Sequence, residues 1–75
     1  MNPAQLLKMA NQIGQFFEAM PDRDEALEGV TMHIRRFWEP RMRKALYQQV
    51  DSAGTEGMIP IVAEAVTRNR ALLAP

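Results

Sequence analysis

The residues best suited to chemistry lie close together, between His33 and Arg43. This stretch reads His-Ile-Arg-Arg-Phe-Trp-Glu-Pro-Arg-Met-Arg and holds four of the chain's seven arginines, its one tryptophan and its one histidine. Arginine presents a planar fork of donors that matches carboxylate and phosphate oxygens, and a tryptophan ring can stack or pack. These residue types predict a surface that binds an anionic group.

Pro40 lies inside this stretch and predicts a joint between two helices, because it lacks an N–H donor and restricts the preceding residue. The helix that begins at Pro40 carries Arg41, Arg43 and Lys44 in its first turn. Cations are disfavoured at the positive end of a helix unless an anion lies among them. We therefore expect a phosphate or an acidic partner here. The candidate ligands at the joint are His33, Arg35, Arg36, Trp38, Arg41, Arg43 and Lys44.

Charge is segregated along the chain although the net charge is zero. Residues 18–28 contain five carboxylates and one arginine, whereas residues 33–46 contain five cations and one carboxylate. This polarity predicts a charged partner or a head-to-tail contact between copies. The alternative is that the acidic residues and Glu39 neutralise the cations within the fold.

Two amides extend the candidate site to the first helix. Asn11 and Gln12 lie on its polar, uncharged face. Side chains of this kind can hydrogen-bond a nucleotide base or the backbone of a partner. The alternative is an ordinary solvated face.

The elements that must position these residues are all predicted to be helices. Asn2 and Pro3 are typical of a helix start, and an apolar residue recurs every three or four positions from Leu6 to Met20. The expected helices cover residues 3–20, 22–38, 40–50 and 58–73, with a loop at 51–57. The predicted fold is an all-α bundle of three to four short helices, forming a single domain over residues 1–75, with antiparallel neighbours.

Helical spacing also predicts which aromatic rings face outward. Phe17 and Phe37 fit the inward faces, whereas Phe16 and Trp38 are the expected apolar surface for a partner. Gly29 indicates either a weak point in the second helix or a place where two helices approach closely.

Composition argues against several functional classes. The chain has no cysteine, one histidine and no Gly-rich phosphate loop, so we expect neither catalysis nor a metal site. No apolar run is long enough to span a membrane, and the N-terminal residues do not resemble a signal peptide, so a cytoplasmic location is expected. A nucleic-acid-binding module is a weaker alternative, because such domains usually carry more cations.

Three segments are similar to one family. They are Met-Ala-Asn-Gln-Ile-Gly-x-Phe-Phe at 9–17 with Pro21, His-x-x-x-Phe-Trp-x-Pro-Arg-Met-Arg at 33–43, and Ile-Val-x-Glu-Ala-Val at 61–66. Together they resemble the delta subunit of NAD-dependent formate dehydrogenase. The motif positions are Asn11, Gln12, Phe16, Phe17, His33, Phe37, Trp38, Pro40, Arg41 and Arg43.

The resemblance implies an accessory subunit of a bacterial enzyme with a molybdenum or tungsten bis-guanine-dinucleotide cofactor, iron–sulfur clusters and flavin, all held by larger subunits. The implied role is a chaperone for maturation or stability. It would act by binding those subunits, and a guanine nucleotide such as GTP or the phosphates of the molybdenum cofactor would be suitable ligands. A purely structural interaction subunit is the alternative. The sequence leaves open whether the chain is a transient helper or a permanent subunit, whether it dimerises, and which metal the enzyme uses.

Overall fold

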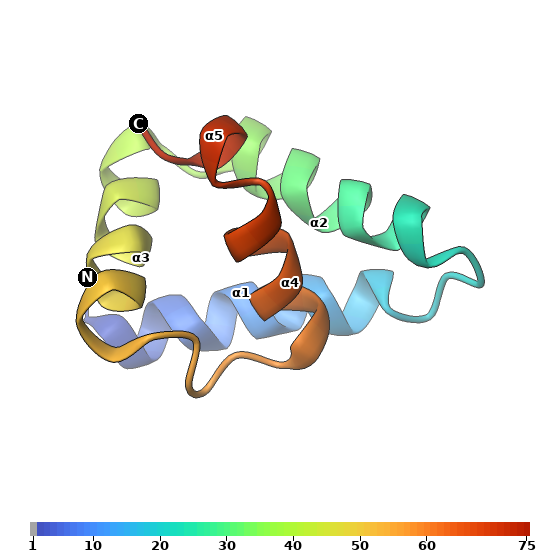
Figure 1. The fold of residues 1–75 in the computed structure, drawn as a ribbon, viewed down its shortest axis with the longest axis horizontal. Helices are drawn as coiled ribbons and strands as arrows, with labels where there is room; N and C mark the ends of the chain where they lie inside the picture. Colours follow the sequence, from blue (N-terminus) through green and yellow to red (C-terminus); the bar gives the residue numbers. More distant parts are fainter. Residues whose placement is uncertain (1) are drawn as a thin grey trace.

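The computed structural model describes residues 2–75 as helices joined by short connections, with no strand in that range (Figure 1). Met1, the first residue of the expected domain, lies outside the described part. The helices are α1 (Pro3–Phe17), α2 (Arg23–Phe37), α3 (Pro40–Ala53), α4 (Pro60–Arg68) and the single turn α5 (Arg70–Leu73). The predicted all-α fold is thus confirmed, with four helices longer than one turn. No helix in residues 2–75 has the length and apolar character needed to cross a membrane.

The helix ends follow local chemistry, with three departures from expectation. The Oδ1 atoms of Asn2 and Asp22 accept hydrogen bonds from backbone N–H groups of the first turns of α1 and α2. The first helix ends at Phe17 rather than residue 20, and the third extends to Ala53, where Gly54 takes a φ of +72°. The expected last helix begins at Pro60 and breaks at Asn69.

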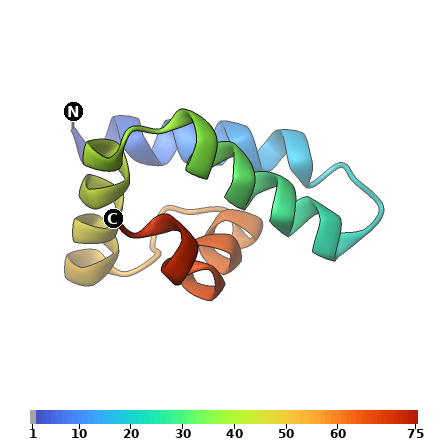
Figure 2. The ribbon, with the colours of Figure 1, turned by 90° about the horizontal axis from the view of Figure 1, so that it is seen from above.

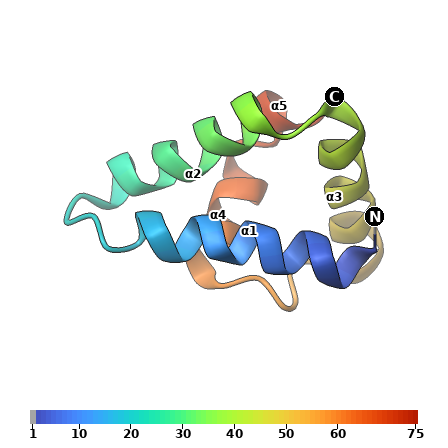
Figure 3. The same ribbon diagram turned by 180° about the vertical axis from the view of Figure 1, so that it is seen from behind.

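The helices α1 and α2 form an antiparallel pair, joined by the turn at 18–22 (Figures 1 and 3). Seen from above, α3 crosses one end of this pair, and α4 and α5 lie along one of its sides (Figure 2). The opposite side of the pair faces the viewer in Figure 3 and is covered by no helix.

The core forms where α4 packs against the α1–α2 pair. Its largest fully buried apolar side chains are Leu6, Val30, Ile34, Leu46, Ile61, Val62, Val66 and Leu73. Gly14 permits this packing, because a Cβ atom there would lie 2.5 Å from Val62 Cγ2. Gly29 plays a similar part between α1 and α2, where a Cβ atom would collide with the Phe17 ring. The expected close approach at Gly29 is thus confirmed.

Candidate functional site

Two of the candidate arginines bind the end of α5. Arg43 is buried, and its Nη1 donates to the carbonyl oxygen of Leu73 at 3.0 Å, while its Nε donates to the carbonyl of Trp38 at 3.3 Å. Arg35 Nη1 donates to the carbonyl of Leu72 at 2.9 Å. The last carbonyls of a helix lack partners within the helix and carry its negative end. These two cations therefore serve as caps for α5.

The other candidate cations, Arg36, Arg41 and Lys44, are exposed. Within residues 2–75, no carboxylate lies within 4.0 Å of them. The ion pairs found there are Arg23–Glu64, Arg68–Glu64 and Arg70–Asp51. None of these joins the acidic residues of 18–28, or Glu39, to the cations of 33–46. The expected alternative, neutralisation of the cluster within the fold by direct ion pairs, is not realised.

The amide of Asn11 is engaged in holding a loop. Its Nδ2 donates to the carbonyl of Gly57 at 2.8 Å, and its Oδ1 accepts from the backbone N–H of Ile59 at 3.0 Å. These two bonds fix the chain that leads into α4. Gln12, the next residue, is exposed, and its side chain forms no such bond within residues 2–75. Of the two amides, Gln12 is the one free to meet a ligand.

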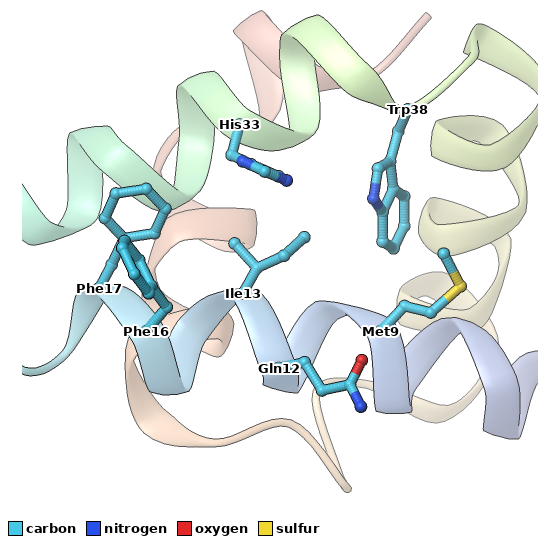
Figure 4. A pocket seen from close by; sticks show the side chains of 7 residues that line it. All are labelled: Met9, Gln12, Ile13, Phe16, Phe17, His33 and Trp38. Carbon is cyan, nitrogen blue, oxygen red and sulfur yellow. The ribbon is translucent and has the colours of Figure 1, made fainter.

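A groove of about 440 Å³ runs between α1 and α2 on the side that no helix covers (Figure 4). It is lined by Met9, Gln12, Ile13, Phe16, Phe17, His33 and Trp38, and is hereafter the α1–α2 groove. Three of the candidate residues thus meet at one place: Gln12 from α1, His33 from α2, and Trp38 from the joint after α2. The remaining candidates do not line this groove.

Aromatic rings continue from the groove along its rim. The Phe16 and Phe17 rings meet edge to face at 5.0 Å, Phe17 and His33 lie 6.3 Å apart, and His33 and Phe37 lie 4.8 Å apart. The two ends of this row are solvated, since Phe16 is 74% and Phe37 71% exposed. Exposed aromatic side chains beside an apolar groove are typical of interaction surfaces.

The predicted orientation of two rings is wrong. Trp38, expected outside, is only 5% exposed, whereas Phe37, expected inside, is exposed. Helical spacing does not apply to Trp38, because its φ and ψ of −87° and 130° are extended and redirect its side chain to the groove wall. Phe37 occupies the last helical position of α2 and rests only on His33 among the rings. The outward position of Phe16 and inward position of Phe17 are as predicted.

The groove walls are mainly apolar and contain no carboxylate. Their polar groups are the Gln12 amide, the His33 imidazole and the Trp38 indole N–H, a set that suits a planar ring or the apolar face of another helix. Met9 and Ile13 are partly buried and also pack against the core, so helical spacing alone does not distinguish groove walls from core positions. Within residues 2–75, no three His, Asp or Glu side chains gather as a cation site.

A second cluster, which the sequence did not reveal, joins α3 to the C-terminal helices. Tyr47 Oη donates to the carbonyl of Val66 at 2.8 Å, and burial raises the pKa of Tyr47 to about 12. Arg70 lies over the Tyr47 ring at 4.7 Å and binds both oxygens of Asp51 at 2.8 Å. That hydrogen bonding lowers the pKa of Asp51. The cluster holds α4 and α5 against α3.

Comparison with known families gives a match over most of the chain. Residues 5–66 match the model of the family described as NADH-dependent formate dehydrogenase delta subunit. The matched segment contains the α1–α2 groove and all nine candidate residues. Among curated proteins and among solved structures, no significant match was found.

Proposed function

This chain belongs to the family of NADH-dependent formate dehydrogenase delta subunits, and we propose that it is a cytoplasmic accessory subunit that docks on a larger subunit through the α1–α2 groove. A delta subunit associates with other subunits of formate dehydrogenase. In this proposal it supports maturation or stability of the enzyme and takes no part in the redox chemistry.

The observation that carries this proposal is the pair of exposed rings at the groove. Phe16 and Phe37 are 74% and 71% exposed and end the row of aromatic rings that borders an apolar groove. Leaving such rings in water is unfavourable, whereas aromatic side chains that enter a partner's pocket contribute strongly to binding. An amphipathic helix or an apolar loop of the larger subunit would fill the groove in the manner of a helix bound to a hydrophobic groove.

Co-purification of the assembled enzyme tests this docking surface. A tagged chain with Phe16→Ala and Phe37→Ala should lose most of the other formate dehydrogenase subunits, and formate oxidation in the extract should fall. Leu72→Ala is the matched control, because Leu72 is also exposed and apolar but lies on α5. Circular dichroism checks that each variant is folded. A folded double variant that retains its partners would contradict the proposal.

A second candidate function is binding of a guanine nucleotide or of the guanine and phosphate groups of the molybdenum cofactor. It is favoured by the meeting of Gln12, His33 and Trp38 around one groove. A base could lie between the aromatic walls with Gln12 at its edge. Arg36 lines a neighbouring hollow that shares Phe17 and His33 with the groove, and could meet a phosphate there.

Titration with GTP, GDP, ATP and inorganic phosphate tests this second candidate. A ligand that binds only the folded chain raises its melting temperature. Stabilisation by guanine nucleotides, lost in Gln12→Ala and kept in Gln15→Ala, would support a nucleotide site in the groove. Equal melting temperatures with and without every ligand would reject the nucleotide and leave subunit docking as the function.

A further inference from the structure

The outer face of α2 carries a second, separate surface feature. A shallow hollow of about 410 Å³ lies there, lined by Met20, Glu25, Glu28, Gly29, Met32 and Arg36. Glu25, Gly29, Met32 and Arg36 recur at spacings of four, three and four, and Glu28 borders them, so they form one stripe along the helix. We name these five residues the α2 stripe.

The α2 stripe is acidic at its start, apolar at its centre and cationic at its end. Glu25, Glu28 and Arg36 are exposed, and the ion pairs found in residues 2–75 include none of them. Met32 is half buried, and beside it the Phe17 ring rests on Gly29. The charges of this stripe therefore form no ion pair within residues 2–75.

The stripe is complementary to itself when two copies run antiparallel. A twofold axis midway between Gly29 and Met32 places Glu25 opposite Arg36 of the second copy. It likewise places Met32 opposite Gly29 with its Phe17 ring, while Glu28 lies at the edge of the contact. A parallel arrangement would place like charges together. Methionine sulfur against an aromatic ring is a favourable contact, so the centre is compatible as well.

We propose that two copies of this chain associate through the α2 stripe in this antiparallel, twofold arrangement. Each Glu25–Arg36 contact then occurs twice, because a twofold interface is built from the same patch on both copies. Exposed ion pairs contribute little individually, so the charges set the orientation while the apolar centre supplies attraction. The association is weak and is favoured by low salt. The five stripe residues do not line the α1–α2 groove, although the Phe17 ring borders both surfaces, and the dimer does not depend on the proposed docking.

Sedimentation equilibrium of charge-reversed variants tests the arrangement. Glu25→Arg or Arg36→Glu alone brings like charges together at two places, so the dimer dissociation constant should rise about tenfold or more. Mixing these two variants in equal amounts should restore association, since every contact in the mixed dimer again joins opposite charges. Neither variant alone should associate as well as the mixture does.

A second pair of variants controls for net charge. Glu56→Arg and Arg41→Glu change the net charge equally but lie outside the α2 stripe, in the loop before α4 and in α3. Each of these two variants should dimerise with the same dissociation constant as the unchanged chain. An equal mixture of the two should do so as well. The neutral variants Glu25→Gln and Arg36→Gln disturb folding less than the charge reversals do. They should raise the dimer dissociation constant by a smaller factor than the reversals.

Three results would overturn the proposal. One is a chain that stays monomeric up to about 1 mM, a concentration at which a dimer with a dissociation constant of about 1 mM is half formed. Another is dimerisation unaffected by the single reversals, and the third is a mixture that fails to recover. Phe16→Ala, which alters only the groove, should dimerise normally. Failure of the dimer is thus distinguishable from failure of subunit docking.

Discussion

Arg43 Nη1 lies 3.0 Å from the carbonyl oxygen of Leu73, thirty residues further along the chain, and donates a hydrogen bond to it. This contact explains how a cation is accommodated at the start of α3. A cation is disfavoured there unless negative charge lies nearby, and the C-terminal end of α5 provides partial negative charge. For Arg43 the expected anion is thus part of the chain itself. The cations left for an external anion are Arg36, Arg41 and Lys44.

Replacing Arg43 by alanine should destabilise the fold. Arg43→Ala leaves the carbonyls of Trp38 and Leu73 without their donor, which we expect to lower the free energy of unfolding by about 2–4 kcal/mol. Arg41→Ala, two residues away and exposed, should change it by about 0.5 kcal/mol or less. Urea unfolding followed by circular dichroism measures both. Equal effects of the two substitutions would argue against a capping role for Arg43.

Removing the Asn11 amide should loosen the loop before α4. Asn11→Ala loses the bonds to Gly57 and Ile59, at an expected cost of about 1–3 kcal/mol of stability, and should speed hydrogen exchange of the Ile59 amide. Gln12→Ala is the control, because Gln12 is exposed and should leave both quantities unchanged. If Asn11 instead served only a ligand, its removal would alter binding without altering exchange.

Adding a methyl group at Gly14 should force α1 away from α4. The new Cβ would lie 2.5 Å from Val62 Cγ2 and 2.8 Å from Ile59 Cδ1, so the helices must shift. We expect Gly14→Ala to lower stability by about 1–3 kcal/mol, although alanine is the better helix former. Gln15→Ala, on the exposed face of the same helix, provides the comparison in thermal unfolding. A Gly14→Ala chain as stable as that control would contradict the close packing.

Ionisation of Tyr47 should make the fold less stable at high pH. Its pKa is about 12 in the folded chain and about 10 when unfolded, so between these values only the unfolded state loses the proton. Stability is therefore fully present below pH 10 and falls as pH rises to 12, by about 2–3 kcal/mol. Tyr47→Phe lacks this loss, so the stability difference between the two chains should narrow over that interval. A constant difference would reject the raised pKa.

The Asp51 carboxyl should titrate below its usual range because of Arg70. Hydrogen bonds from that guanidinium favour the ionised carboxylate, so the stabilising contact is present above the unfolded pKa and is lost as pH falls. NMR titration of Asp51 in Arg70→Gln should show its pKa returning toward the ordinary value. An unmoved Asp51 would show that Arg70 does not set its pKa.

The sequence alone determined the helical architecture and the family. Asn2 with Pro3, and Pro40, are local signals, so α1 and α3 begin where expected, and α2 begins at Arg23, one residue after the expected start. Such caps require only neighbouring residues, and the apolar spacing from Leu6 onward needs no knowledge of distant contacts. The motif around Trp38 and Pro40 likewise identified the family directly.

Only the tertiary structure decided what the candidate residues contact. Arg43, Arg35 and Asn11 bind backbone groups 30, 37 and 46 residues away, and no local spacing reveals partners at such distances. A further distant contact lies at the break of the last helix, where Asn69 Nδ2 donates to Thr31 Oγ1 at 2.9 Å. The α1–α2 groove forms because α4 covers one side of the helix pair and leaves the other open. Which residues are free for a partner therefore depends on packing between distant segments.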